Sequence, residues 1–243
     1  MEQTMDSNIP KKDVTLRVQF EQFKDNYRQE IQKSISFIGQ DLDFFTEVKV
    51  GHLLELTRRY VGDPEKLKIL DVGCGVGVTD RFLTSHFKKL YGVDLSPGVV
   101  RKAARLNPKA SYRHYNGKTL PYPAGSMDVT FAICVMHHVL PGHLNRFVQE
   151  MARVTRKGGL VAIFEHNPWN PLTLRAVSQC EMDHDALLLK MGKVERIFGQ
   201  APIELVEKKF ILFTPFRAGF FRWLEGVLGW LPLGAQYYVA AKR

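Results

Sequence analysis

The sequence contains few cysteines. Three occur among its 243 residues, Cys74, Cys134 and Cys180, and no two of them form a C-x-x-C pair. An odd number of scattered cysteines predicts neither a disulfide framework nor a zinc site. We therefore expect reduced thiols, as in cytoplasmic proteins.

Long apolar runs, secretory signals and internal repeats are also missing. The most apolar stretch, residues 210–233, is interrupted by Arg217, Arg222 and Glu225, which is not typical of a membrane span. Residues 1–14 lack the apolar run of a secretory signal. These absences predict a soluble, cytoplasmic, globular protein.

Negative charge is in deficit. The chain has 34 Lys and Arg against 25 Asp and Glu, a formal net charge of +9. Such an excess is compatible with an anionic partner, such as nucleic acid, an acidic lipid surface or a phosphorylated substrate. The clearest cluster repeats every four residues, at Arg101, Arg105 and Lys109, which favours a solvated helix face over a binding patch.

Short apolar segments alternate with helical patterns along most of the chain. This alternation predicts an α/β fold with a parallel sheet covered on both faces. The expected parallel strands are residues 68–72, 90–94, 110–115, 127–134 and 160–165. Strands at 203–213 and 235–241 should follow, the last running antiparallel at the sheet edge. We therefore expect a three-layer, Rossmann-like sheet of about seven strands.

The first 60 residues are predicted to be helical. Apolar residues recur at helical spacing over 20–35, and a second helix is expected at 44–60. We interpret residues 1–60 as an N-terminal helical cap and 61–243 as the main α/β domain. Within that domain, helices are expected from the glycine motif to about His86, from Ser96-Pro97 to Asn107, over 141–156, and up to about Phe198.

The strongest motif is Ile-Leu-Asp-Val-Gly-Cys-Gly-Val-Gly at residues 69–77. It places Gly73, Gly75 and Gly77 between a buried strand and a helix. Glycines let the backbone approach a ligand closely, and a helix start offers free N–H groups to a negative group. Asp94 ends the next strand, where a carboxylate can accept both hydroxyls of a ribose.

A nicotinamide-binding fold shares this logic, but its G-x-G-x-x-G/A fingerprint requires a small residue where this chain has Val78. The motif LDVGCGVG followed by an acidic residue such as Asp94 instead resembles the class I S-adenosylmethionine-dependent methyltransferases. The resemblance extends over residues 67–165 and includes Leu120-Pro121-Tyr122 and Lys157-Gly-Gly.

The resemblance implies a cofactor site for S-adenosylmethionine, which would leave as S-adenosylhomocysteine. The backbone at Gly73, Cys74, Gly75 and Cys134 would surround the methionyl part, with Gly77 completing the motif and Asp71 near the ammonium. Asp94 would hold the ribose, Leu95 would lie beside the adenine, Asn116 and Gly117 would stand at the adenine amino group, and Tyr27 would reach the cofactor from the cap.

Three histidines are candidates for accepting a proton from a hydroxyl acceptor. His137 and His138 follow the fourth strand, and His166 follows Glu165 at the end of the fifth. The alternative is that these histidines only pack and hydrogen-bond. His184 could belong to a catechol-type metal site, but a helix cap is the better interpretation, and no metal site is predicted.

Motifs that the sequence lacks narrow the class of methyl acceptor. The Asn/Asp-Pro-Pro-aromatic motif of enzymes that methylate adenine or glutamine nitrogen does not follow the fourth strand, and Cys134 follows Ile133 rather than proline. Nucleic acid is therefore disfavoured, and a small-molecule acceptor is expected, methylated at oxygen and apolar or lipid-linked. An RNA methyltransferase that uses the basic surface and a non-catalytic cofactor-binding protein remain alternatives.

Residues 216–230 have an unusually broad apolar pattern at helical spacing. It predicts a helix packed on the sheet. Two other interpretations are a lid over an apolar acceptor and an interfacial helix that makes peripheral membrane contact.

Overall fold

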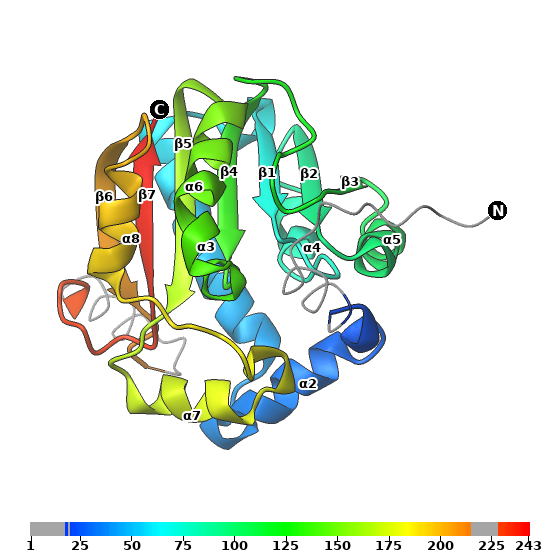
Figure 1. Ribbon diagram of the computed structural model, residues 1–243, viewed down its shortest axis with the longest axis vertical. Coiled ribbons are helices and arrows are strands. Elements are labelled where there is room, and N and C mark those ends of the chain that lie inside the picture. The colour runs from blue at the N-terminus through cyan, green and yellow to red at the C-terminus, as the bar shows by residue number, and fades with distance from the viewer. Residues whose placement is uncertain (1–17, 19, 215–227) are drawn as a thin grey trace.

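The computed structural model describes residues 18, 20–214 and 228–243 (Figure 1). Its seven-stranded sheet has the order β3-β2-β1-β4-β5-β7-β6, in which β7 runs antiparallel to the other six strands. The strands are β1 Lys68–Val72, β2 Lys89–Asp94, β3 Ser111–His114, β4 Met127–Ile133, β5 Thr155–His166, β6 Glu204–Ile211 and β7 Gln236–Lys242. The predicted Rossmann-like α/β architecture is confirmed.

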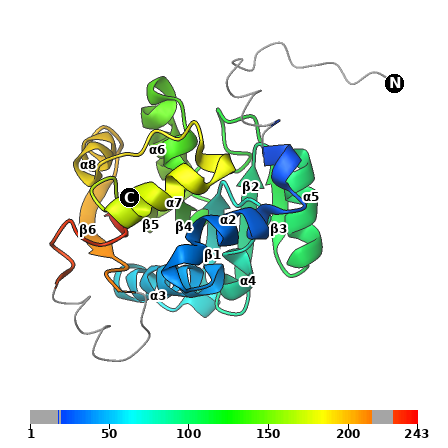
Figure 2. The same cartoon turned by 90° about the horizontal axis from the view of Figure 1, so that it is seen from below.

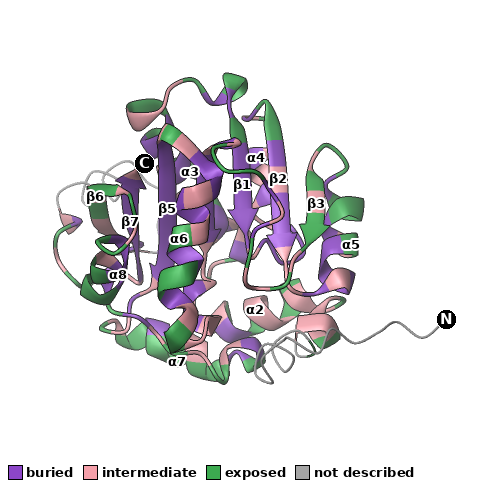
Figure 3. Cartoon of the chain, turned by 45° about the horizontal axis from the view of Figure 1, so that its top comes forward, coloured by how far each residue is buried: buried purple, intermediate pink, exposed green. Residues whose placement is uncertain are grey.

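Helices cover both faces of the sheet. The α-helices are α2 Tyr27–Ile35, α3 Leu42–Tyr60, α4 Asp80–Leu83, α5 Pro97–Leu106, α6 Leu144–Val154, α7 Pro171–Gln179 and α8 Met191–Phe198. Figure 2 shows α6 and α8 on one side of the strands and α3 and α4 on the other. Each side has its own apolar core, built on alternate strand residues, and the strands between them are buried (Figure 3).

Local capping explains where the main helices begin. The Asp41 carboxylate accepts the Phe44 N–H at 2.8 Å at the start of α3. Ser96 Oγ accepts the Val99 N–H, and Pro97 fills the first position of α5. Each cap satisfies an N–H group that the helix itself leaves unpaired.

Two helices cross the carboxyl ends of the parallel strands. Figure 1 shows α2 and α7 below the arrowheads of β4 and β5, and the two helices contact each other. By contrast, α3 packs on the sheet through Phe44, Leu53 and Leu56. The division of the chain at residue 60 stays a prediction.

The edge strand differs from the expectation. The sequence places 235–241 at the sheet edge, but β7 lies between β5 and β6. Nearly all of β7 is buried, whereas β6 carries Glu204, Glu207, Lys208 and Lys209 along its length. A charged strand tolerates the edge, and the apolar one is therefore placed inside the sheet.

Two other boundaries also differ. The helix expected to extend to His86 contains four residues as α4. The helix expected over 141–156 ends at Val154, and β5 begins at Thr155 instead of residue 160. Thr155 Oγ1 donates to Thr130 Oγ1 at 2.8 Å, and the Arg156 guanidinium pairs with Asp128 at 2.5 Å. These contacts join the chain to β4 immediately after α6.

The apolar helix predicted over 216–230 lies mostly outside the described residues. Trp230, which is described, is 75% exposed. Among residues 18, 20–214 and 228–243, no helix is both long enough and apolar enough to cross a membrane.

We predict that the Asp41→Ala variant is less stable than the wild type by about 1 kcal/mol, because the first turn of α3 loses its cap. For a chain of this size, the thermal midpoint should fall by about 2–4 °C, measured by circular dichroism. The Asp41→Asn variant should retain most of the stability, since asparagine also caps helices. An unchanged midpoint for Asp41→Ala would show that the cap contributes nothing.

Candidate functional site

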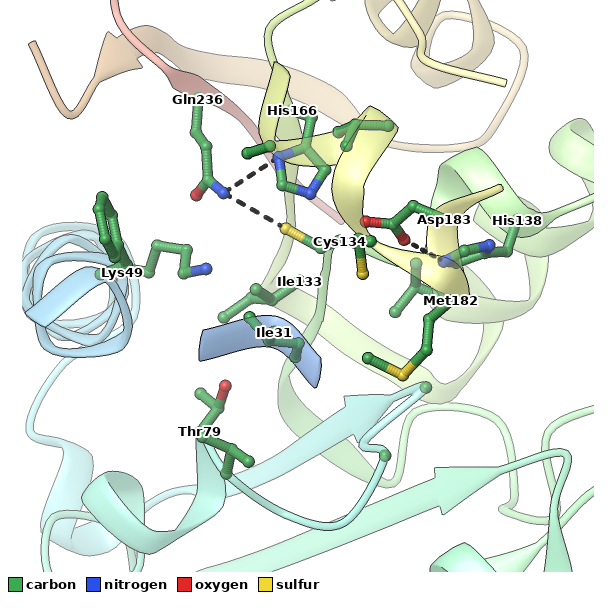
Figure 4. Close-up of a pocket in the computed structure, with 18 of the residues that line it drawn as sticks. Ile31, Lys49, Thr79, Ile133, Cys134, His138, His166, Met182, Asp183 and Gln236 are labelled. Atoms are coloured by element: carbon green, nitrogen blue, oxygen red, sulfur yellow. Dashed lines mark hydrogen bonds and ion pairs between the residues drawn. The ribbon is translucent and has the colours of Figure 1, made fainter. Parts of the chain in front are cut away.

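A cavity of about 290 Å³ lies at the carboxyl ends of the parallel strands (Figure 4). Its walls come from the ends of β1, β2, β4 and β5, from the first residue of β7, and from α2, α3 and α7. In open α/β sheets, ligands bind at this edge. The cavity therefore lies where the glycine motif predicts a cofactor.

The glycine loop after β1 forms one wall. Gly73 and Gly75 line the cavity with positive φ angles of 83° and 53°. A Cβ atom at Gly73 would lie 2.5 Å from Val135 Cγ2, and one at Gly75 would lie 3.1 Å from the Tyr27 hydroxyl. Only glycine allows the backbone to adopt these angles this close to its neighbours. Tyr27 also lines the cavity, from α2.

Asp94 ends β2, and backbone groups hold its carboxylate in place. Oδ2 accepts the Gly75 N–H and Oδ1 accepts the Ser96 N–H, each at 3.0 Å. Burial raises the pKa of this carboxyl group, and the two N–H groups partly counter that effect. A carboxylate has about four acceptor positions, so capacity remains for ligand hydroxyls. Asp94 and Leu95 both line the cavity.

Asp71 does not line the cavity, although the resemblance implies a contact with the cofactor ammonium. Its side chain is buried behind the loop, in contact with the carboxyl group of Asp80. Burial and this second carboxyl group raise the pKa of Asp71 well above its usual value, and burial raises that of Asp80 to about 7. Two like charges in contact do not both ionise, so the pair retains a proton and supports the loop from behind.

Cys74 and Gly77 also lie outside the cavity wall. The Cys74 side chain is buried, and its N–H donates to Val93 O at 3.0 Å. Gly77 has a φ of 76°, and a Cβ atom there would lie 2.4 Å from Asn107 Nδ2. The third glycine therefore allows the loop to pack against the end of α5.

Of the two residues predicted at the adenine amino group, one lines the cavity and the other does not. Asn116 is exposed, and its Oδ1 accepts the N–H groups of Lys118 and Thr119 at 2.9 and 3.0 Å. Its amide therefore forms a turn. The next residue, Gly117, does line the cavity, with a φ of 75°.

Cys134 follows β4 and lines the cavity at its centre (Figure 4). It has a φ of 55°, rare for a residue with a side chain, and its N–H donates to Phe164 O at 2.8 Å. The Gln236 amide approaches Cys134 Sγ at 3.6 Å. This left-handed residue sets the direction of the chain after β4, the segment that carries His137 and His138.

Glu165 anchors that turn from the end of β5. Its fully buried carboxylate accepts the N–H groups of Val135 and Met136 at 3.1 and 2.6 Å, and its Oε2 lies 2.5 Å from His137 Nδ1. The His137 side chain is fully buried and does not line the cavity. This placement gives His137 a supporting position and corrects the expectation that it meets the acceptor.

Asp183 connects the two neighbouring histidines. Its Oδ1 lies 3.2 Å from His138 Nε2 and 3.5 Å from His137 Nε2, and both Asp183 and His138 line the cavity. The edge of the Phe20 ring packs against His138 at 5.1 Å. The two histidines and Asp183 could also hold a metal ion, since their ligand atoms lie within 4.8 Å of one another. Direct ion pairs account for the same spacing.

The pKa values of this cluster diverge. Burial alone would lower the pKa of His137, but the carboxylates of Glu165 and Asp183 raise it well above its usual value. Burial and the His137 charge lower the pKa of His138. Burial opposes the charge of Asp183, yet its close contacts with His137 and His138 lower its pKa strongly. At neutral pH the cluster holds a charged His137, a neutral His138 and a charged Asp183.

His166 lines the cavity from the end of β5. The Gln236 amide lies 3.3 Å from His166 Nδ1, and burial lowers the pKa of His166 to about 4. His166 is therefore neutral over the physiological range.

The polar residues of the cavity that sequence reasoning missed include Lys49, Asp183 and Gln236. The segment Met182-Asp-His-Asp185 was available as a signal, but it draws attention to His184, whose side chain is 84% exposed. Nothing in the periodicity of α3 or β7 distinguishes Lys49 or Gln236.

Comparisons with known proteins agree with this geometry. Residues 70–163 match the family model described as a methyltransferase domain. The chain is 30% identical over 108 residues to 2-methyl-6-phytyl-1,4-hydroquinone methyltransferase of Synechocystis. The matched region covers 43% of the chain and 33% of that protein. The chain is also 32% identical over 138 residues to ajmaline N-methyltransferase of Rauvolfia serpentina, a match that covers 48% of the chain and 45% of that protein. The chain thus spans about half or less of the length of these curated relatives.

Solved structures share the fold over most of the chain. A possible histamine N-methyltransferase from Thermotoga maritima has a TM-score of 0.66 at 17% identity, covering 93% of this chain and 99% of that one. Magnesium protoporphyrin IX methyltransferase from Synechocystis, solved with bound S-adenosylhomocysteine, has a TM-score of 0.67 at 16% identity, covering 96% and 99%. Residues 70–163 thus form a methyltransferase domain, and the chain has the Rossmann-like fold of the class I S-adenosylmethionine-dependent methyltransferases.

Proposed function

We propose that this protein transfers the methyl group of S-adenosylmethionine to a small apolar acceptor, at an oxygen atom. The observation that carries the proposal is the continuity of one cavity, from Gly73, Gly75 and Asp94 to the pair His138 and Asp183. Hydroquinone and tocopherol methyltransferases among the relatives support a small-molecule acceptor.

The residues present fit the cofactor. S-adenosylmethionine supplies a methyl group activated by a positively charged sulfur. Asp94 would accept the ribose hydroxyls, Leu95 and Gly117 would flank the adenine, and the glycine loop with Cys134 would hold the methionyl part through the backbone. Tyr27 would cover the cofactor from α2, which excludes water from the site.

The chain's part in the reaction is alignment and proton acceptance. Alignment of two bound reactants can supply about 7–11 kcal/mol of the barrier reduction. A hydroxyl acceptor must also lose its proton, and the neutral His138 would take it at Nδ1, because its Nε2–H faces the Asp183 carboxylate. That carboxylate, 3.2 Å from Nε2, would stabilise the resulting imidazolium. His137 and Glu165 are positioning residues, because they hold Asp183 and the turn after β4.

The apolar part of the cavity favours an apolar acceptor. Its wall is lined by apolar residues of α2 and the turn that follows it, of α3 and of α7, namely Ile31, Ile35, Ile38, Phe45, Leu172 and Val177. Burying such surfaces against a ligand contributes about 25 cal/mol per Å² of apolar area. The acceptor would therefore place its hydroxyl at His138 and its apolar body against α2 and α7.

The first test is calorimetric titration with S-adenosylhomocysteine, with NADH as the control ligand. We expect binding of the first and none of the second, because the glycine spacing and Val78 disagree with a nicotinamide site. Binding of NADH alone would reverse the assignment, and failure to bind either ligand would contradict the cofactor site.

The second prediction concerns Asp94. The Asp94→Ala variant should bind S-adenosylhomocysteine about tenfold to 150-fold more weakly, since hydrogen bonds to a charged group contribute about 1.5–3 kcal/mol. Calorimetry gives the affinity, and thermal unfolding shows whether the variant is folded. The Asp185→Ala variant, at an exposed carboxylate, should bind normally. A folded Asp94→Ala protein with wild-type affinity would exclude the ribose contact.

The third prediction concerns the pH dependence of turnover. The pKa of His138 is lowered from 6.5, so His138 stays neutral at pH 7 and becomes protonated only in more acidic solution. With an acceptor found by screening hydroxylated apolar compounds, kcat/KM should fall in acidic solution, with a midpoint more acidic than the ordinary histidine pKa of about 6.5.

The His138→Ala variant should lose about 100-fold or more of this turnover and the acidic limb of its pH profile. The His184→Ala variant is the matched control, because His184 is exposed and directly follows Asp183 at the end of the 3₁₀ turn Glu181–Asp183. Equal turnover in His138→Ala and wild type would rule out the proton-acceptor role.

A further inference from the structure

The cavity contains a buried cation that the reaction described above does not use. Lys49 projects from α3 into the cavity (Figure 4) and is only 6% exposed. Within the described part of the chain, its Nζ atom makes no ion pair or hydrogen bond. An ammonium group has three donors and no acceptor, so all three donors lack protein partners here.

The carboxylates of the cavity wall are already engaged elsewhere. Asp94 is bonded to the backbone N–H groups of Gly75 and Ser96, and Asp183 is paired with His138. Figure 4 shows Lys49 on one side of the cavity and Asp183 with His138 on the other. No carboxylate of the described cavity wall is therefore left to pair with Lys49. An anionic group of a ligand would meet an unpaired ammonium there.

Other unpaired polar atoms accompany Lys49. The buried Gln236 Oε1 and Thr214 Oγ1 have no hydrogen-bond partner among the described residues, and both residues line the cavity. Gln236 begins β7 and Thr214 follows β6, whereas Asp94 ends β2 near the other edge of the sheet. The strands β1, β4 and β5 separate the two ends. Gln236 and Thr214 are therefore remote from the expected nucleoside end. Lys49 lies close enough to act on the charges of Cys134 and His166, the two residues that Gln236 contacts. We call Lys49, Thr214 and Gln236 the polar corner.

We propose that Lys49 Nζ binds a carboxylate or similar anionic group of the methyl acceptor. This inference rests on the proposed function and narrows its acceptor class to amphiphilic acids. The apolar body would lie against α2 and α7, the anion would meet Lys49, and the Gln236 and Thr214 groups would complete its hydrogen bonds. The hydroxyl to be methylated would then face His138, across the cavity.

S-adenosylmethionine also carries a carboxylate, and that group is the competing source of the anion. Because Gln236 also contacts Cys134, which would hold the methionyl part, position alone does not separate the two sources. The two sources differ in what removal of Lys49 does to cofactor affinity.

The experiment compares two probes of equal chain length, decanoate and 1-decanol, titrated into protein saturated with S-adenosylhomocysteine. Wild-type protein should bind decanoate about tenfold or more tightly than 1-decanol, the effect of one charge-assisted hydrogen bond. The Lys49→Met variant should lose this preference and still bind 1-decanol. The Lys49→Arg variant should keep the preference, since its charge is retained.

A matched control removes a charge from the exposed face of the same helix. The Arg58→Met variant should retain the wild-type preference, because Arg58 is exposed and does not line the cavity. In the ligand-free state, Lys49→Met should unfold at the same temperature as wild type or higher, because it removes a buried unpaired charge.

Three results would overturn the proposal. They are equal binding of both probes by wild type, an unchanged preference in Lys49→Met, and weakened S-adenosylhomocysteine binding in Lys49→Met, which would assign Lys49 to the cofactor carboxylate. Absence of methyl transfer with the expected probe preferences would remove the proposed function and leave the anion site. Binding and turnover thus report on the two proposals separately.

Discussion

The buried carboxylate of Glu165 determines the geometry of the site more than any other group. Glu165 is fully buried near the carboxyl end of β5, and an ionised group is stable there only with charged or N–H partners. Its partners are three consecutive residues after β4, and their positions fix both the left-handed turn at Cys134 and the entry of His138 into the cavity. Through His137 it also supports Asp183, which belongs to a distant segment. The His138 side of the cavity therefore depends on one ion pair behind its wall.

Local sequence signals were sufficient for β1, β2 and α5. The strand Lys68–Val72 is an apolar run closed by glycine, and Ser96 with Pro97 marks the helix start, so no distant residue is needed to place them. The order of β6 and β7 was not predictable in this way. Which of two C-terminal strands is inserted beside β5 depends on burial across the sheet, and both strands are long enough for either position.

The same limit applies within the site. Asp71 and Asp94 both lie at strand ends, but Asp71 meets Asp80 behind the loop, whereas Asp94 opens to the cavity. His137 and His138 are neighbours in sequence and occupy opposite sides of the cavity wall. Sequence motifs located the site and its glycine loop. Tertiary contacts decide which of two adjacent or equivalent side chains reaches the cavity. The same contacts place Asp183 and Lys49 in the cavity wall.

The position of β7 has a consequence for the order in which the protein folds during synthesis. In the sheet, β6 pairs only with β7, which leaves the ribosome after it. Until β7 is available, β6 has no strand partner and β5 exposes one edge. Because β7 is antiparallel, its first residue, Gln236, reaches the cavity beside the ends of the parallel strands. The glycine loop can therefore form early, whereas the polar corner is completed only when the last strand is inserted.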